Sequence, residues 1–256
     1  MDVPKTRSES GAAGAVRLLA IGDCNTCGTT NTGPQGTVLD RVAARFRDSG
    51  LTIETQNLGA TMNTSREGIT RARKLARPAD IVLLNFGLVD AWITSIPRIY
   101  IPYFPDSAIR RPLRKLLKSA KRRLRSPMAR RFFPHGPVVP PDEYLQNFTE
   151  IVEVVREKTP GAKIVFWATM PVRNDEQRSA NILRYNELLR TLASELNCHF
   201  VDTPDVLSDL SVDEAFLDMA HLSDTAAERV AHAVYQQLAS SEGSTVAMLS
   251  RVRGAA

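Results

Sequence analysis

Short, almost uninterrupted apolar runs alternate with helix-periodic segments along this chain, and this alternation constrains the fold more than any other feature. The strand-length apolar runs span residues 16–22, 81–86 and 162–169. Runs of this kind are typical of strands buried on both faces of a sheet. Segments with apolar residues at helical spacing span 33–48, 142–158 and 182–196. The pattern predicts an α/β domain with helices on a parallel sheet.

The length and composition fit one large domain. With 256 residues, of which 43% are hydrophobic, the chain can bury one substantial core. We expect a disordered leader at 1–15, a single domain at 16–240 and a flexible tail at 241–256. Periodicity is lost at 92–141, where nine prolines fall. This stretch is therefore predicted to be an insertion after the third strand, with little regular structure beyond a short amphipathic helix around residues 113–117.

Positive charge is concentrated in that insertion. Residues 107–141 hold eleven Lys and Arg and no acid, and subtracting these eleven from the overall charge of +5 leaves −6 on the remainder. A uniformly basic nucleic-acid-binding protein would spread its charge differently. The asymmetry points to one localised anionic partner.

The sequence also allows a prediction of the cellular compartment of the protein. Its apolar runs fall short of the roughly 18 to 20 residues that span a bilayer, and its first 14 residues lack an apolar signal core. Three cysteines, an odd number, disfavour a secreted disulfide framework. We therefore expect a cytoplasmic protein, with peripheral membrane contact through its basic insertion.

Four motifs at predicted strand ends or helix starts resemble the blocks of the SGNH (GDSL-type) hydrolases. They are Ile21-Gly22-Asp23-Cys24, Asn57 to Thr64, Phe86 to Asp90, and Asp218 to Ser223. The resemblance runs over 16–239 and implies a three-layer α/β/α, SGNH/flavodoxin-like fold with a parallel sheet. Of the four residues that name the family, only the histidine is kept. Cys24 replaces its serine, Met62 its glycine and Val89 its asparagine.

The first and last blocks supply candidates for nucleophilic catalysis. Asp218 and His221 lie three residues apart, so on a turn the carboxylate can hold one imidazole nitrogen while the other meets a nucleophile. Cys24 is that candidate nucleophile. We expect the imidazole and the local backbone dipoles to lower the pKa of its thiol.

The middle blocks supply the candidate oxyanion and substrate-binding residues, namely Met62, Asn63, Gly87, Asp90 and Arg98. The backbone N–H groups of Cys24 and Met62 can face an oxyanion, provided that Met62 adopts the backbone geometry of the family's glycine. Val89 cannot supply the missing side-chain donor. Asn63, Asn25 and Arg98 are the candidates to replace it.

Other interpretations remain open for the same residues. Cys24 can be an inert buried residue, and His221 can bind Asp218 for structure alone. Cys24 and Cys27 also form a C-x-x-C pair, which suggests a thiol-disulfide site, although the order of elements is unlike that of a thioredoxin. No second cysteine pair accompanies it at metal-ligand spacing, so we expect neither a metal nor a cofactor.

The third block and the insertion suggest a substrate. Gly87 to Asp90, followed by Arg98 and basic residues, resembles SGNH-like proteins of bacterial surface-polysaccharide assembly. The resemblance implies an acyl-ester hydrolase or O-acyltransferase acting on an acylated carbohydrate or glycan intermediate. The alternative is a catalytically inactive SGNH-fold protein that binds an anionic or acylated glycan or a membrane surface.

The basic residues at 107–131 have more than one possible partner. They can form a solvated loop, or bind an anionic membrane surface or a phosphate-bearing glycan carrier, with leucines providing an apolar face. Specific nucleic-acid binding is not expected, because aromatic residues are sparse among the charges.

Overall fold

A computed structural model describes residues 14–28, 33, 36–97, 99–103, 106–124, 126, 128 and 131–240. Most of the predicted leader, the whole predicted tail and the candidate residue Arg98 lie outside the described residues.

The centre of the domain is a parallel five-stranded sheet with strand order β2-β1-β3-β6-β7. Its strands are β1 (Val16–Gly22), β2 (Ile53–Asn57), β3 (Ile81–Asn85), β6 (Lys163–Trp167) and β7 (His199–Val201). The central strand β3 is buried along its whole length, whereas the edge strand β2 exposes most of its residues. The near-continuous apolar runs therefore mark the strands covered on both faces.

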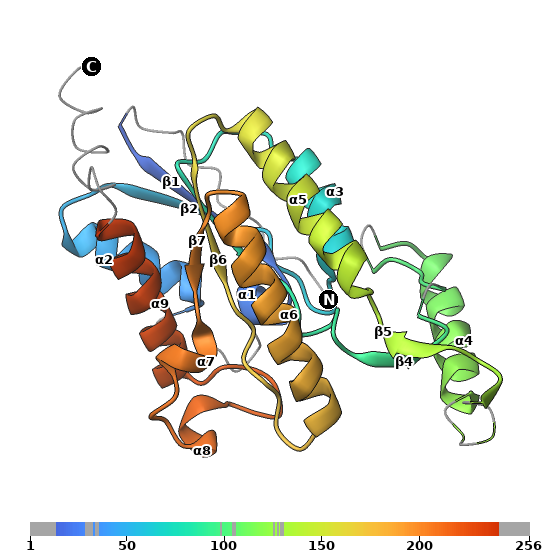
Figure 1. Ribbon diagram of the computed structural model, residues 1–256. Helices are drawn as coiled ribbons and strands as arrows, with labels where there is room; N and C mark the ends of the chain where they lie inside the picture. The colour runs from blue at the N-terminus through green and yellow to red at the C-terminus, as the bar shows by residue number, and fades with distance from the viewer. Residues whose placement is uncertain are drawn as a thin grey trace.

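Helices cover both faces of this sheet, which confirms the predicted three-layer arrangement (Figure 1). The longer helices of the body are α2 (Val38–Asp48), α3 (Ser65–Arg73), α5 (Pro141–Lys158), α6 (Glu176–Glu195) and α9 (Asp224–Ala239). The short ones are α1 (Cys24–Cys27), α7 (Thr203–Val206) and α8 (Val212–Ala215). One core cluster lies beneath α2 and α9, and the other beneath α3, α5 and α6.

Local capping sets where several helices begin. A capping box precedes α3, since the Glu67 carboxylate accepts hydrogen bonds from the Thr64 N–H and hydroxyl at 2.8 and 2.7 Å. Ser223 caps α9 by accepting a hydrogen bond from the backbone N–H of Ala226 at 3.1 Å. α2 begins later than predicted, because Thr37 forms its own capping box with Asp40.

The insertion has more regular structure than its sequence predicted. It holds the 14-residue helix α4 (Arg110–Arg123), longer than the predicted short helix. Its ends pair as the antiparallel strands β4 (Ile93–Ser95) and β5 (His135–Pro137). Figure 1 shows α4 to one side of the body, beside this ladder. In the described ranges, none of the helices is long and apolar enough to cross a membrane.

Candidate active site

The candidate nucleophile lies at the carboxyl end of β1, where α1 begins. The buried carboxylate of Asp23 caps this short helix by accepting from the Asn25 N–H at 3.0 Å. Its other oxygen accepts from the Leu88 N–H at 3.2 Å, beyond the end of β3. One carboxylate thus holds two strand-end loops together and fixes the backbone on both sides of Cys24.

The second block approaches the thiol closely. Met62 has φ +63°, so it adopts the left-handed geometry that its position requires. Its backbone N–H donates to Cys24 Sγ at 3.2 Å. Gly59 permits this approach, because a Cβ there would lie 2.5 Å from the Cys27 backbone nitrogen. The structure therefore retains a backbone donor at the thiol although the family's glycine is absent.

Asp218 and His221 form the predicted hydrogen-bonded pair. The distance from His221 Nδ1 to Asp218 Oδ2 is 2.7 Å, and the backbone N–H groups of Ala220 and His221 donate to Asp218 Oδ1 at 2.8 and 2.9 Å. Partial burial acts to raise the pKa of Asp218, but these hydrogen bonds outweigh it and hold the pKa below its usual value. Asp218 is thus an ionised group that fixes the imidazole.

Asn25 connects α1, the short helix that begins at Cys24, to the loop that carries His221 (the histidine loop). Its Nδ2 donates to the Ala220 carbonyl at 3.4 Å, and its Oδ1 accepts from the Leu222 N–H at 3.2 Å. Cys24 and His221 consequently line the same cavity, of about 350 Å³. The sequence suggested Asn25 as an oxyanion donor, whereas the structure uses its side chain to hold these two loops together.

The resting state of the thiol differs from the prediction. Burial and the neighbouring Asp23 carboxylate raise the pKa of Cys24 to about 12, although the Met62 N–H acts to lower it. The predicted lowering was wrong because desolvation disfavours the thiolate more than the local dipoles stabilise it. At neutral pH the thiol is protonated, so its attack on a carbonyl requires a base during the reaction.

Two residues of the third block, Gly87 and Asp90, lie beneath the site. Asp90 is completely buried, and its Oδ1 accepts from the Ser65 N–H and hydroxyl at 2.9 and 2.6 Å. Burial raises its pKa to about 6 despite those hydrogen bonds. Gly87 is also buried, with φ +141°. The expectation that Gly87 and Asp90 bind substrate is therefore corrected, because they support the loops from inside.

The position of the missing asparagine is apolar. Val89 is almost fully buried and lines a cavity together with Met62. Of the candidates to replace its donor, Asn63 lies next to Met62, is buried, and has a side-chain Nδ2 without a partner in the described part of the chain. Arg98 lies outside the described residues.

Arg178 is a site residue that the sequence did not suggest. It extends from α6 and donates from Nε to the Leu88 carbonyl at 3.1 Å, while its guanidinium lies 4.7 Å from the centre of the Trp92 ring. Burial lowers its pKa, and the nearby Asp23 and Cys24 oppose that effect. Its partners are about 90 residues away in the sequence, so no local pattern could have revealed it.

The two cysteines of the C-x-x-C pair are free and make separate contacts. Cys27 Sγ donates to the Gly28 carbonyl at 3.0 Å, whereas Cys24 Sγ receives the Met62 N–H. Burial raises the pKa of Cys27 as well. In the described ranges, no cluster of three metal-ligating side chains is present.

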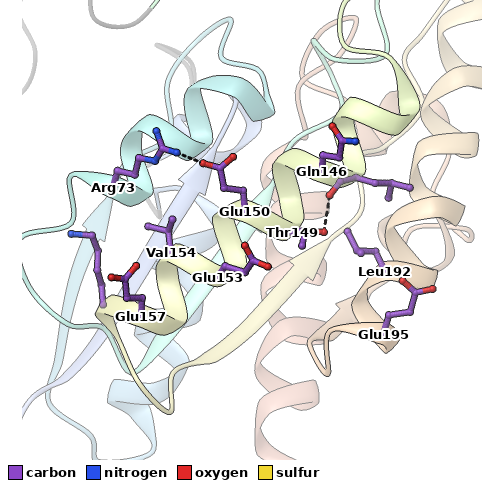
Figure 2. A pocket seen from close by; sticks show the side chains of 11 residues that line it. Arg73, Gln146, Thr149, Glu150, Glu153, Val154, Glu157, Leu192 and Glu195 are labelled. Carbon is purple, nitrogen blue, oxygen red and sulfur yellow. Dashed lines mark hydrogen bonds and ion pairs between the residues drawn. The ribbon is translucent and has the colours of Figure 1, made fainter.

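A hollow of about 870 Å³ lies elsewhere on the surface, over α3, α5 and α6. Figure 2 shows Arg73 paired with Glu150, with Glu153 and Glu157 further along α5 and Glu195 across the hollow on α6. None of the predicted catalytic residues lines it, so its size does not mark a site.

The sequence and the fold of this chain are similar to those of known proteins. Residues 20–229 match the GDSL-like Lipase/Acylhydrolase family. The solved structure of Axe2, an acetylxylan esterase from Geobacillus stearothermophilus, has a TM-score of 0.60 at 21% identity, covering 88% of this chain and 94% of that one. The structure of TesA has a TM-score of 0.58 at 16% identity, covering 87% of this chain and 97% of that one. No curated protein matches the sequence significantly.

Proposed function

The chain belongs to the GDSL-like lipase/acylhydrolase family and is an esterase-type hydrolase, and we propose that it acts on an acylated carbohydrate or glycan intermediate. In this proposal Cys24 is the nucleophile, His221 the general base and Asp218 the residue that orients the imidazole. The acyl group then passes either to water or to another hydroxyl group.

The observation that supports catalysis most strongly is the position of the Met62 N–H. A backbone donor 3.2 Å from the sulfur is well placed for the oxygen of a carbonyl that the sulfur attacks. Met62 keeps φ +63° to place it there, a geometry that a non-glycine residue adopts only at a cost of about 1 kcal/mol. A site that had lost its catalytic activity would not require this backbone geometry at Met62.

Acylation begins with the protonated thiol. His221 accepts the Sγ proton as sulfur attacks the ester carbon, and the carbonyl π electrons move onto oxygen, which faces the Met62 and Cys24 N–H groups. The tetrahedral species collapses, the C–O ester bond breaks, and His221 donates its proton to the leaving alkoxide. The products are a thioester on Cys24 and a free alcohol.

Deacylation reverses the roles of the same groups. His221 takes a proton from water or from an acceptor hydroxyl, whose oxygen attacks the thioester carbon. The C–S bond breaks and the proton returns to sulfur, so the thiol is restored. Because a thiolate is a good leaving group, this step favours onward transfer of the acyl group as well as hydrolysis.

Two findings support a carbohydrate substrate. The cavity shared by Cys24 and His221 is also lined by Thr37, Asp213 and Glu214, whose oxygens can bind sugar hydroxyls. The similar Axe2 structures are those of an acetylxylan esterase, and catalytic mutants of it change a serine, an aspartate and a histidine. That aspartate and histidine are three residues apart, as Asp218 and His221 are here.

Acetate release from an acetylated xylo-oligosaccharide tests this proposal. Wild-type protein should release acetate, Cys24→Ala and His221→Ala should lose release almost entirely, and Cys24→Ser should retain it. Full release by Cys24→Ala would exclude the thiol as nucleophile. Inactivity of wild type toward sugar esters together with activity toward simple aryl esters would exclude the carbohydrate substrate alone.

A second candidate function is binding of an acylated or anionic glycan without turnover. The raised pKa of the Cys24 thiol and the apolar Val89 favour it, since both remove features that an efficient acyl transferase would use. Sugar-ester binding by calorimetry, without release of acid over hours, would favour this function.

We also propose that the basic insertion docks on an anionic membrane surface. α4 has no buried residues, and large apolar side chains around it are exposed. They are Ile109, Leu113, Leu116, Met128, Phe132 and Phe133. Exposed apolar groups beside clustered lysines and arginines are typical of interfacial helices.

Sedimentation with vesicles tests this docking. Wild-type protein should bind vesicles that contain phosphatidylserine, bind less as salt rises, and ignore neutral vesicles. Leu116→Glu should abolish binding, whereas Leu183→Glu, at an exposed leucine on α6, should leave it unchanged. Equal binding by Leu116→Glu, or capture of a soluble phosphorylated glycan without vesicle binding, would overturn the membrane assignment.

A further inference from the structure

A second cavity, of about 440 Å³, extends from the oxyanion residues to α4. Met62 and Val89 line it, whereas Cys24 and His221 line the smaller cavity described above. No described residue lines both cavities. The Met62 N–H, which contacts the sulfur, links them, so a group attached to Cys24 has two different environments within reach.

The chemistry assigns one part of an ester to each cavity. His221 must reach the alcohol oxygen to protonate it, so the alcohol lies in the cavity that His221 lines. The carbonyl oxygen faces the N–H of Met62. The remaining substituent of the carbonyl carbon is the acyl chain, and the space beyond Met62 and Val89 is the second cavity.

The walls of that second cavity combine apolar and cationic side chains. The aliphatic ones are Val89, Ile93, Ile99, Ile101, Leu117 and Val138. The cationic ones are Arg114, Lys115, Lys118, Lys121 and Arg122, all from α4. No described acidic residue lines the cavity, and although Arg114 pairs with Asp106 outside the lining, the remaining cations leave a net positive charge.

Near α4, two polar groups, the Lys121 ammonium group and the Tyr103 hydroxyl, lack an ion-pair or hydrogen-bond partner among the described residues. Lys121 is partly buried and makes no ion pair there, while burial and the nearby Arg66 lower the pKa of its ammonium group. The Tyr103 hydroxyl is buried without a hydrogen-bond partner among described residues. Lys118 lies 5.3 Å from the centre of the Tyr103 ring. An anion bound here would relieve the charge crowding and accept from the tyrosine.

We propose that this cavity is the acyl site of the enzyme and that it selects an acyl group with an apolar stem and an anionic terminal group. The stem lies along the aliphatic wall, and the terminal anion is bound by Lys121 and the Tyr103 hydroxyl. This inference rests on the proposed function for the placement of the ester, but the binding of the anion does not require turnover.

Matched esters test the selectivity. For wild-type protein, kcat/KM for the mono-p-nitrophenyl ester of adipic acid should exceed that for p-nitrophenyl hexanoate, which has the same chain length without the charge, by about tenfold. Lys121→Met should bring the two values close together. Arg123→Gln, which removes a cation from α4 outside the cavity lining, should preserve the preference. Tyr103→Phe, which loses only an unpaired hydroxyl, should reduce it severalfold.

Binding to the Cys24→Ala protein separates this inference from catalysis. Calorimetric titration should detect monomethyl adipate and not dimethyl adipate, and Lys121→Met should remove the signal. Binding with this dependence in a protein that turns over neither ester would retain the cavity assignment and reject the proposed catalysis. Turnover without charge preference, or a preference unchanged by both Lys121→Met and Tyr103→Phe, would reject the assignment.

Discussion

Cys24 should react with an alkylating reagent far more slowly than an ordinary cysteine, in spite of its proposed role. Burial and the Asp23 carboxylate raise its pKa from 9.0 to about 12. Each unit changes the thiolate fraction tenfold, so at neutral pH that fraction is about 10³-fold smaller than for an unperturbed thiol. Iodoacetamide labelling, followed by peptide mass spectrometry, measures the rate for Cys24 in folded protein and in protein unfolded by urea.

The pH dependence separates the pKa from simple shielding. Shielding lowers the rate equally at every pH, whereas a pKa near 12 makes the Cys24 rate rise about tenfold per pH unit from pH 7 to 10, without a plateau. His221→Ala should leave this profile unchanged. Rapid labelling with a plateau below pH 7, abolished by His221→Ala, would show a resting thiolate-imidazolium pair and refute the reasoning.

Three further predictions concern residues around the thiol. Burial raises the pKa of Asp23 from 3.8 to about 7, so between these two pH values the folded state retains a proton that the unfolded state releases. The free energy of unfolding should therefore fall as pH rises from 4 to 7, by up to about 1.4 kcal/mol per pH unit from this group. Urea denaturation measures this fall, and Asp23→Asn should show a flatter dependence on pH. Asn25→Ala should lower kcat for ester hydrolysis about tenfold with little change in KM, because the histidine loop loses its link to α1; an unchanged kcat would show that this link is dispensable. Val89→Asn restores a side-chain donor and should raise kcat by about tenfold or more in steady-state assays, whereas a decrease would mean that packing at this position matters more than the donor.

The layers of the fold were predictable because their signals are local. β1 and β3 are apolar along most of their length since helices cover both faces, and the capping box of Thr64 and Glu67 marks the start of α3 within four residues. The ladder of β4 and β5 was not predictable. Each strand has only three residues, the two are about 40 residues apart in the sequence, and β5 contains both a glycine and a proline.

In the site too, the local interactions were predictable from the sequence, whereas those that depend on tertiary packing were not. Asp218 and His221 interact across three residues, so their spacing predicts the hydrogen bond that the structure shows. The contact between Met62 and Cys24 joins two loops, and only the family resemblance suggested it. Arg178 and the raised pKa of Cys24 depend on tertiary packing. The burial that dominates the pKa of the thiol has no local sequence signature.

Capture of the acyl-enzyme tests the central claim most directly. Wild-type protein mixed rapidly with p-nitrophenyl acetate and quenched in acid should carry one acetyl group, mapped to Cys24 by peptide mass spectrometry and removed by hydroxylamine as expected of a thioester. His221→Ala should accumulate it far more slowly. Acetylation at another residue, or steady turnover by Cys24→Ala, would contradict Cys24 as the nucleophile.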